Sequence, residues 1–238
     1  MNPRSSSPAS QSGERERLTA AYASRPAAAF DTWFDPAHRV IHQERERRAL
    51  ALLAREGFAS LAEARILDIG CGSGNWLLDV VRWGAVPERV FGVDLLADRV
   101  ATARRMAAPG VTVIQGDISA LDFPAASFDL VIQSTVFSSI LDADRRERTA
   151  AEMRRVVKPG GMILWYDLRV NNPRNVNVRA VSTKEISVLF PDCAVRAERL
   201  TLAPPIARAV APVSTITCEL LALVPFLRTH TLAAIHPR

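Results

Sequence analysis

Short apolar runs alternate with segments of helical periodicity along most of this chain, starting near residue 66. The apolar runs predict strands that are buried on both faces of a sheet. We expect strands at 66–69, 89–94, 111–116, 128–133 and 161–168, and helices at 74–83, 97–108, 144–157 and 182–189. Such alternation is typical of a mostly parallel sheet with helices on both faces, so we predict a doubly wound α/β fold.

The region before the first strand divides into two parts. Residues 1–16 mix Ser, Pro, Gln and charged side chains without periodicity, which predicts a disordered tail. Residues 17–58 show a helical pattern, and Asp35 followed by Pro36 is a typical helix start. We therefore expect a helical cap at 17–58, followed by a single α/β domain at 59–238.

Two more strands are expected near the C-terminus, at 195–202 and 229–235, on either side of an apolar segment at 204–227. The apolar residues of this segment recur at helical spacing, which predicts an amphipathic helix packed on the domain. A substrate lid, a dimer face or a helix at a membrane surface would show the same pattern. These alternatives, a homodimer among them, stay open at this point.

Charge and cysteine content narrow the classes of partner. The chain has 238 residues and a formal charge of +5. Its arginines are interleaved with acids, which is the pattern of solvated helix faces, so no nucleic-acid partner is expected. The three cysteines show neither disulfide nor metal-ligand spacing, so no metal site is expected. No apolar run reaches the ~20 residues that span a membrane, and we expect a cytoplasmic protein.

The segment at 66–74 carries the main chemical signal, because an apolar strand runs into Gly70, Gly72 and Gly74. Glycines allow positive φ and let a ligand approach the backbone, and the free N–H groups that open the next helix favour electron-rich ligand groups. Asp94 ends the following strand, where nucleotide-binding folds place a carboxylate that accepts from ribose hydroxyls. The segment therefore predicts a cofactor-binding turn.

The spacing of the glycines separates two classes of cofactor. A dinucleotide fingerprint requires Gly-x-Gly-x-x-Gly, whereas here the third glycine arrives one residue early and Asn75 follows it. Asp68 adds a carboxylate beside the turn, which suits an ammonium group better than a diphosphate. We therefore expect a cofactor with a ribose, a cationic amine and no phosphate. An NAD(P)-dependent oxidoreductase is the alternative.

The sequence Asp-Ile-Gly-Cys-Gly-Ser-Gly at 68–74 resembles the first signature of class I S-adenosylmethionine-dependent methyltransferases. The segments at 113–118, 127–134 and 157–161 resemble later signatures in the same order. The resemblance implies a Rossmann-like, seven-stranded sheet with its last strand antiparallel. It also implies S-adenosylmethionine as cofactor, S-adenosylhomocysteine as product, and no metal. The cofactor-binding residues are then expected to be Asp68, Gly70, Cys71, Gly72, Gly74, Asp94, Leu95, Asp117, Ile118, Gln133 and Ser134.

Methyl transfer from a sulfonium is an in-line displacement, so positioning supplies much of the catalysis. A general base is needed only when the acceptor atom holds a proton at neutral pH. The candidates for catalysis are His38 and His42 on the helical cap and Tyr166 at the end of the fifth strand. Polar residues of the loop after that strand are typical of binding loops. Acceptor contacts are expected at Tyr166, Asn171, Asn172 and Arg174.

The segment after the fourth expected strand indicates which class of acceptor to expect. The segment Gln133–Phe137 takes the place where amino-methylating nucleic-acid enzymes of this type carry a Pro-Pro-aromatic run. We therefore expect methylation of an O or N atom of a small-molecule metabolite. A subunit that binds S-adenosylmethionine without transferring its methyl group is the non-enzymatic alternative.

Overall fold

The computed structural model describes residues 13, 16–21, 33–173 and 175–238. Residues 16–21 are helical. The predicted tail at 1–16 lies outside the described residues except at positions 13 and 16. Within the predicted cap, residues 22–32 also lie outside them.

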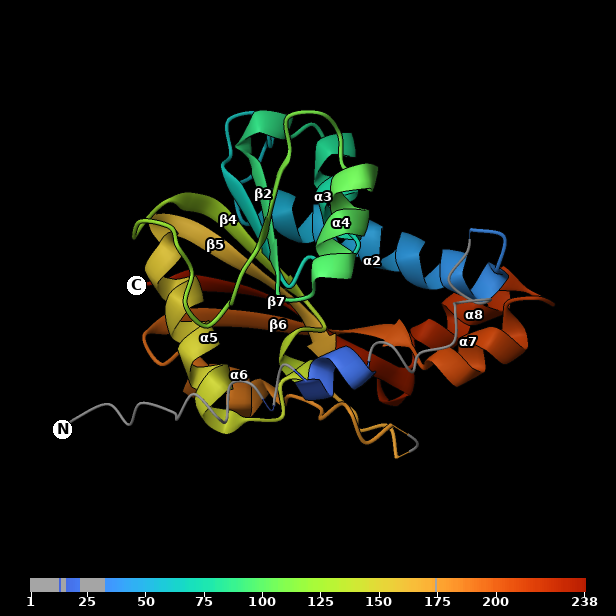
Figure 1. The fold of residues 1–238 in the computed structure, drawn as a ribbon. Helices are drawn as coiled ribbons and strands as arrows, with labels where there is room; N and C mark the ends of the chain where they lie inside the picture. Colours follow the sequence, from blue (N-terminus) through green and yellow to red (C-terminus); the bar gives the residue numbers. More distant parts are fainter. Residues whose placement is uncertain (1–12, 14–15, 22–32, 174) are drawn as a thin grey trace.

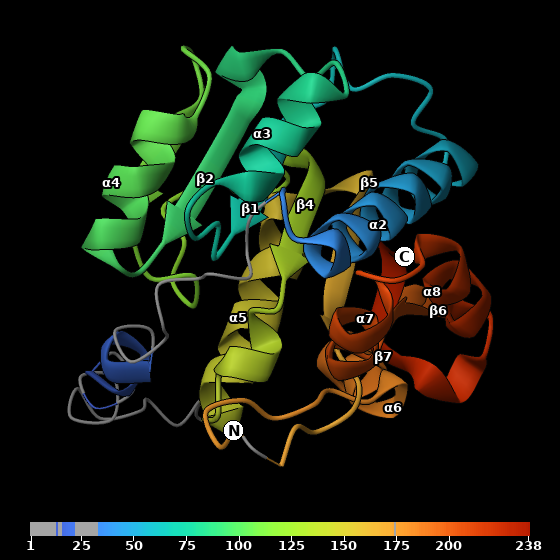
Figure 2. The same ribbon diagram turned by 90° about the vertical axis from the view of Figure 1, so that its right-hand side faces the viewer.

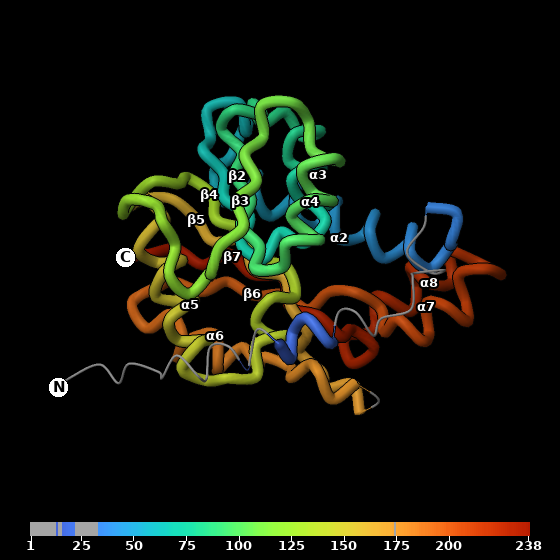
Figure 3. The backbone as a smooth tube through the Cα atoms, viewed as in Figure 1, coloured from blue at the N-terminus to red at the C-terminus, as the bar shows by residue number. Residues whose placement is uncertain are grey.

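The core of the molecule is a seven-stranded sheet with the strand order β3-β2-β1-β4-β5-β7-β6 (Figures 1 and 3). Every neighbouring pair is parallel except those made by β7, which runs antiparallel to both β5 and β6. The strands are β1 Ile66–Ile69, β2 Val90–Asp94, β3 Thr112–Gln115, β4 Phe128–Ser134, β5 Val157–Leu168, β6 Cys193–Leu202 and β7 Arg228–Pro237. The mostly parallel, Rossmann-like sheet with an antiparallel last strand is confirmed.

Helices cover both faces of the sheet (Figure 2). Alternate residues of β1 show why both faces are apolar: Ile66 packs in the cluster that contains α2, α3 and α4, and Leu67 in the cluster that contains α5 and α6. The helices are α2 Pro36–Arg55, α3 Asn75–Arg82, α4 Ala97–Met106, α5 Ala143–Val156 and α6 Thr183–Leu189, with 3-10 turns η1 Pro87–Arg89 and η2 Phe137–Ser139. No helix in the described part of the chain is long and apolar enough to cross a membrane.

The apolar segment at 204–227 forms two short helices, not the one amphipathic helix that its spacing predicts. These are α7 Pro204–Val210 and α8 Thr215–Ala222, followed by η3 Pro225–Leu227. The side chain of Ser214 accepts a hydrogen bond from the N–H of Thr217 and so starts a new helix. Buried Ala207 and Cys218 join Ala37 of α2 in a small separate core, which places the insertion beside the N-terminal half of α2 (Figure 2).

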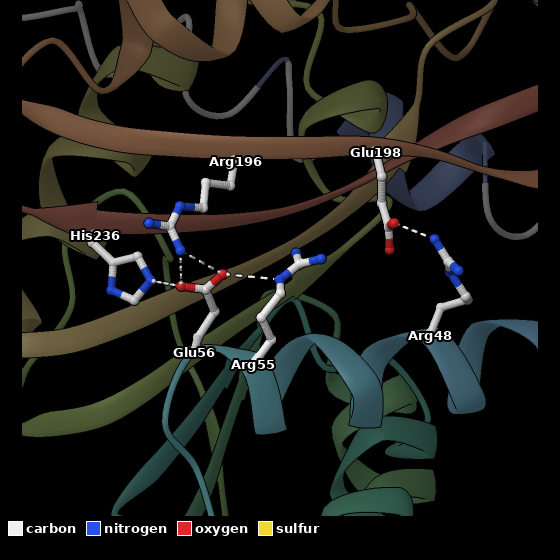
Figure 4. A network of polar contacts seen from close by, with 6 residues as sticks. All are labelled: Arg48, Arg55, Glu56, Arg196, Glu198 and His236. Carbon is white, nitrogen blue, oxygen red and sulfur yellow. Dashed lines mark hydrogen bonds and ion pairs between the residues drawn. The ribbon is translucent and has the colours of Figure 1, made fainter.

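The C-terminal end of α2 is held to β6 and β7, at one edge of the sheet, by a group of polar contacts (Figure 4). The carboxylate of Glu56 accepts from Arg196 of β6 at 3.1 Å, from His236 of β7 at 3.1 Å and from Arg55 at 3.4 Å. The other ring nitrogen of His236 lies 3.2 Å from the carbonyl oxygen of Gly161. Because both partners are acceptors, the His236 ring donates both bonds only when it is protonated.

Further contacts hold α2 along its length. Arg48 pairs with Glu198 of β6, as Figure 4 also shows, and Arg45 pairs with Asp79 of α3 at 3.2 Å. The helix is therefore fixed against both the sheet and α3. This placement decides where the side chains of its N-terminal half lie.

Substitution of Glu56 by glutamine is expected to lower the free energy of unfolding at pH 7 by about 1 kcal/mol, since its arginine partners are half exposed. Although burial alone would raise the pKa of Glu56, Arg196, Arg55 and His236 together lower it below its ordinary 4.5. The stabilisation is therefore complete above pH 4.5 and lost as the pH falls through the lower folded value. Urea titrations from pH 7 to pH 3 should show the free energies of unfolding of wild type and Glu56→Gln converging. A difference that stays constant over this range would contradict the prediction.

Candidate functional site

A cavity of about 640 Å³ opens at the carboxyl ends of β1, β2 and β4, on the glycine turn. This is the edge at which ligands bind in doubly wound sheets, beside the switch in strand order between β1 and β4. The predicted cofactor residues that line the cavity are Asp68, Gly70, Cys71, Gly72, Asp94, Leu95, Ile118 and Ser134. The structure thus brings together segments that lie far apart in the sequence.

The glycine turn packs closely against neighbouring side chains because it has none of its own at Gly70 and Gly72. Gly70 has φ +62°, and a Cβ there would lie 2.6 Å from Cγ2 of Val136. Gly72 has φ +55°, and a Cβ there would lie 3.0 Å from a guanidinium nitrogen of Arg99. Burial raises the pKa of the Cys71 thiol between them, so this thiol stays protonated and is no nucleophile. The turn is a backbone cradle.

Three predicted cofactor residues do not line the cavity. Gly74 precedes α3 with φ +89°, and a Cβ there would lie 3.2 Å from that of Ala103, so this glycine allows α3 and α4 to pack closely. Asp117 accepts a 2.8 Å bond from Arg145, which itself lines the cavity. Gln133 is fully buried and accepts from a backbone N–H of the turn after β4. These residues support the walls.

Two carboxylates give the cavity its chemical character. Asp94 accepts from the N–H of Gly72 and from the N–H of Leu96, both at 2.9 Å, which fixes its carboxylate at the end of β2. Asp68 is 2 % exposed, and its Oδ2 has no hydrogen-bond partner among the described residues. Burial, and next the charge of Asp94, raise the pKa of Asp68 well above its ordinary value. A ligand ammonium group would satisfy this oxygen, so the residues present fit an amine-bearing cofactor with a ribose.

A second cavity of about 220 Å³ adjoins the first. The two share lining residues from α2 and from the end of β4, namely His38, His42, Arg45, Ser134 and Thr135. The remaining walls of the smaller cavity come from α2, the ends of β5, β6 and β7, and α7; these residues are Asp35, Ala37, Ile41, Tyr166, Thr201, Pro204, Arg208 and His230. These five residues form a boundary that the two cavities share.

The two predicted histidines lie at that boundary. His38 and His42 are one helical turn apart, and their rings stack at 3.9 Å between centroids, with Trp33 against the edge of His38 at 5.6 Å. Burial, and then the charges of Arg45 and His38, lower the pKa of His42 to about 3. The imidazole of His42 is consequently neutral at pH 7 and is a weak base.

Tyr166 lies in the wall of the smaller cavity and does not line the larger one. Its hydroxyl and that of Thr201 are 2.7 Å apart, and its ring stacks on that of His230 at 4.8 Å. Burial raises the pKa of Tyr166 to about 12. With its hydroxyl paired, this tyrosine shapes the wall and is not positioned as a proton acceptor.

Of the loop residues predicted to contact the acceptor, the two that the structure describes, Asn171 and Asn172, line neither cavity. Oδ1 of Asn171 accepts a 2.7 Å bond from the N–H of Ala180, so this side chain ties the start of the loop to its end. Asn172 is exposed in the same loop. Arg174 lies outside the described residues.

Two residues of the boundary were missed by sequence reasoning. Arg45 is 8 % exposed, pairs with Asp79 and lies over the ring of Trp76 at 4.7 Å. Thr135 has φ +56°, which is strained for a β-branched residue and is the kind of conformation that gathers at ligand sites. Arg45 could have been predicted from the sequence because it lies on the same helix face as His42. Nothing in the sequence indicates the conformation of Thr135.

Residues 66–161 match a protein family described as methyltransferase domain. A putative methyltransferase of Encephalitozoon cuniculi is 40% identical over 104 residues, which cover 44% of this chain and 45% of that protein. The trans-aconitate 2-methyltransferase of Azoarcus sp. is 36% identical over 145 residues, or 60% of this chain and 52% of that protein. A solved S-adenosylmethionine dependent methyltransferase from Mesorhizobium loti, 19% identical, matches with a TM-score of 0.57 over 79% of this chain and 98% of its own.

These matches differ in what they support. The chain spans about half the length of the curated relatives it matches. The matched segment at 66–161 contains β1 to β4 and the glycine turn. Arg45 and Arg208 of the smaller cavity lie outside it. The solved structure, at its low identity, supports the fold.

Proposed function

We propose that this chain transfers the methyl group of S-adenosylmethionine to a small molecule, because residues 66–161 match a methyltransferase domain and the larger cavity has an unpaired Asp68 oxygen and a fixed Asp94 carboxylate for such a donor. The methylated atom is an oxygen or a nitrogen of a metabolite that occupies the smaller cavity. The observation that carries this proposal is the shared boundary, where His38, His42 and Arg45 line both cavities. Donor and acceptor can meet there in line, as displacement at the methyl group requires.

The residues of the larger cavity would hold the donor by its polar groups. Asp68 provides an unpaired carboxylate oxygen for the amine, and Asp94 provides a fixed carboxylate for the ribose hydroxyls. Leu95 and Ile118 provide apolar surface for the adenine. When bound, the donor supplies an activated methyl group. The protein's part is to place the acceptor and to exclude water.

The size of the smaller cavity supports a small acceptor. Its volume of about 220 Å³ is below the roughly 300 to 1,000 Å³ of pockets for drug-sized ligands. One relative is named for trans-aconitate, which is a small metabolite. A reaction on a soluble metabolite in the cytoplasm is part of this proposal.

Titration calorimetry tests the donor half of the proposal. S-adenosylhomocysteine should bind at one site per chain, and NADH should not bind. Absence of binding by S-adenosylhomocysteine, together with binding of NADH, would replace the proposal by the oxidoreductase alternative. Binding without methyl transfer to any acceptor would favour the non-catalytic subunit.

Replacement of His42 by glutamine is expected to lower kcat by less than tenfold. General bases contribute about 10²- to 10⁴-fold, but an imidazole with a pKa of about 3 is too weak for that role at pH 7. Steady-state rates of the variant between pH 6 and pH 9 measure the effect. A hundredfold loss together with an altered pH profile would instead identify His42 as the base.

A further inference from the structure

The charged side chains of the smaller cavity favour an anion. Arg45 and Arg208 line it with two guanidinium groups, and Asp35 is the one carboxylate among its described lining residues. Oδ1 of Asp35 is committed to the helix start, where it accepts from the N–H of Ala37 at 2.9 Å. The cavity is therefore lined by two guanidinium groups and by one carboxylate, of which one oxygen already accepts a hydrogen bond.

The two guanidinium groups differ in position. Arg45 is buried at the boundary with the larger cavity, where its pair with Asp79 and the ring of Trp76 fix its orientation. Arg208 is on α7, is exposed, and lines only the smaller cavity. The planar guanidinium fork matches a carboxylate, which can accept two parallel hydrogen bonds from it. One arginine thus lies near the methyl donor and the other lies at the solvent side.

Three side chains of this cavity, His42, His230 and Tyr166, are poorly suited to removing a proton at neutral pH. Burial lowers the pKa of His42 to about 3 and that of His230 to about 4, and it raises the pKa of Tyr166 to about 12. None of these three groups is matched to taking a proton from an alcohol at neutral pH. A carboxylate has already lost its proton at pH 7 and presents a lone pair without help.

We propose that the acceptor is a small carboxylic acid, bound as the carboxylate by Arg45 and Arg208 and methylated on a carboxylate oxygen. The inference rests on the proposed function and names its substrate class. A lone pair of the carboxylate oxygen forms the new C–O bond, while the C–S bond of the donor breaks and leaves its electron pair on sulfur. The products are a methyl ester and a thioether, and no proton moves.

Transfer of a labelled methyl group tests the substrate class. The full-length protein is incubated with methyl-labelled S-adenosylmethionine and trans-aconitate, succinate or octanoate, each beside the alcohol and the amine of equal chain length. We expect label in at least one acid, released as methanol by mild alkali because esters hydrolyse and ethers and methylamines do not. Alkali-stable label alone, or no label in any acid while S-adenosylhomocysteine binds, overturns the inference. Failure of S-adenosylhomocysteine to bind overturns the proposed function instead.

Substitution of Arg208 tests the site. For the acid that takes the label, Arg208→Gln should raise Kd in the presence of S-adenosylhomocysteine by about tenfold, and Arg208→Lys should recover part of it. The affinity for S-adenosylhomocysteine itself should not change. Arg105→Gln on α4 removes the same charge from an exposed residue outside both cavities and is the matched control. Equal acid affinity in Arg208→Gln and Arg105→Gln would overturn the assignment of Arg208.

Discussion

Replacement of Asp94 by alanine should weaken binding of S-adenosylhomocysteine by roughly tenfold to a hundredfold. Hydrogen bonds to a charged group contribute about 1.5 to 3 kcal/mol, and each 1.4 kcal/mol is a factor of ten in Kd. The carboxylate is 6 % exposed and held by the N–H groups of Gly72 and Leu96, so it is preorganised for the ribose hydroxyls. Titration calorimetry with S-adenosylhomocysteine measures the loss.

Because Asp94 also holds the glycine turn, a control must separate ribose binding from turn geometry. Asp94→Asn keeps one acceptor oxygen and removes the charge, so its affinity should lie between those of wild type and Asp94→Ala. Asp98→Ala, at an exposed acid in the first turn of α4, should bind as wild type does. Unchanged affinity in Asp94→Ala would show that the ribose is held elsewhere.

Replacement of Arg146 by methionine should lower the free energy of unfolding by about 1 to 3 kcal/mol, as is typical when a buried hydrogen-bonding group loses its partner. Arg146 is 1 % exposed. It donates to the carbonyl oxygen of Ile140 at 2.6 Å and to Glu185 of α6 at 2.7 Å. Methionine fills much of the volume but leaves the carbonyl oxygen of Ile140 without this donor, whereas Glu185 keeps its pair with Arg179.

Urea denaturation monitored by circular dichroism measures this loss. Arg148→Met on the same helix, at a less buried position, should change the free energy of unfolding by less than 1 kcal/mol. Since Ile140 also lines the larger cavity, the Arg146 variant should bind S-adenosylhomocysteine more weakly as well. If Arg146→Met lost no more stability than Arg148→Met, the role assigned to buried Arg146 would be contradicted.

The sheet and the cofactor turn were accessible from sequence because local rules determine them. Strands buried on both faces read as continuous apolar runs, and the positive φ angles at Gly70 and Gly72 require glycine. The sequence predicted that the fifth strand starts at 161, whereas β5 starts at Val157, which pairs with Phe128. The difference arises because the Lys-Pro-Gly-Gly segment after Val157 has no strand pattern. The segment at 204–227 divides into α7 and α8 because Ser214 caps the start of α8. Hydrophobic periodicity alone gives no sign of this break.

The acceptor side depends on tertiary placement and was less accessible. His38 and His42 could be proposed, but Arg45 reaches the boundary only because contacts along α2 fix that helix against α3 and the sheet. The side chains of Asn171 and Asn175 instead hold the loop itself, since they accept hydrogen bonds from the backbone N–H groups of Ala180 and Asn177. Amide-rich loops satisfy their own backbone as readily as they bind a ligand.

Under the proposed function, the separation of the two cavities has a consequence for the choice of substrate. The donor cavity is built largely on the glycine turn and the strands of the matched segment, whereas α2, α7 and the ends of β6 and β7 supply most of the acceptor walls outside it. Changes in those outer elements can retune the choice of substrate without disturbing the shared chemistry. Arg45 is one of the residues that line both cavities, so a substitution there would affect the binding of donor and acceptor together.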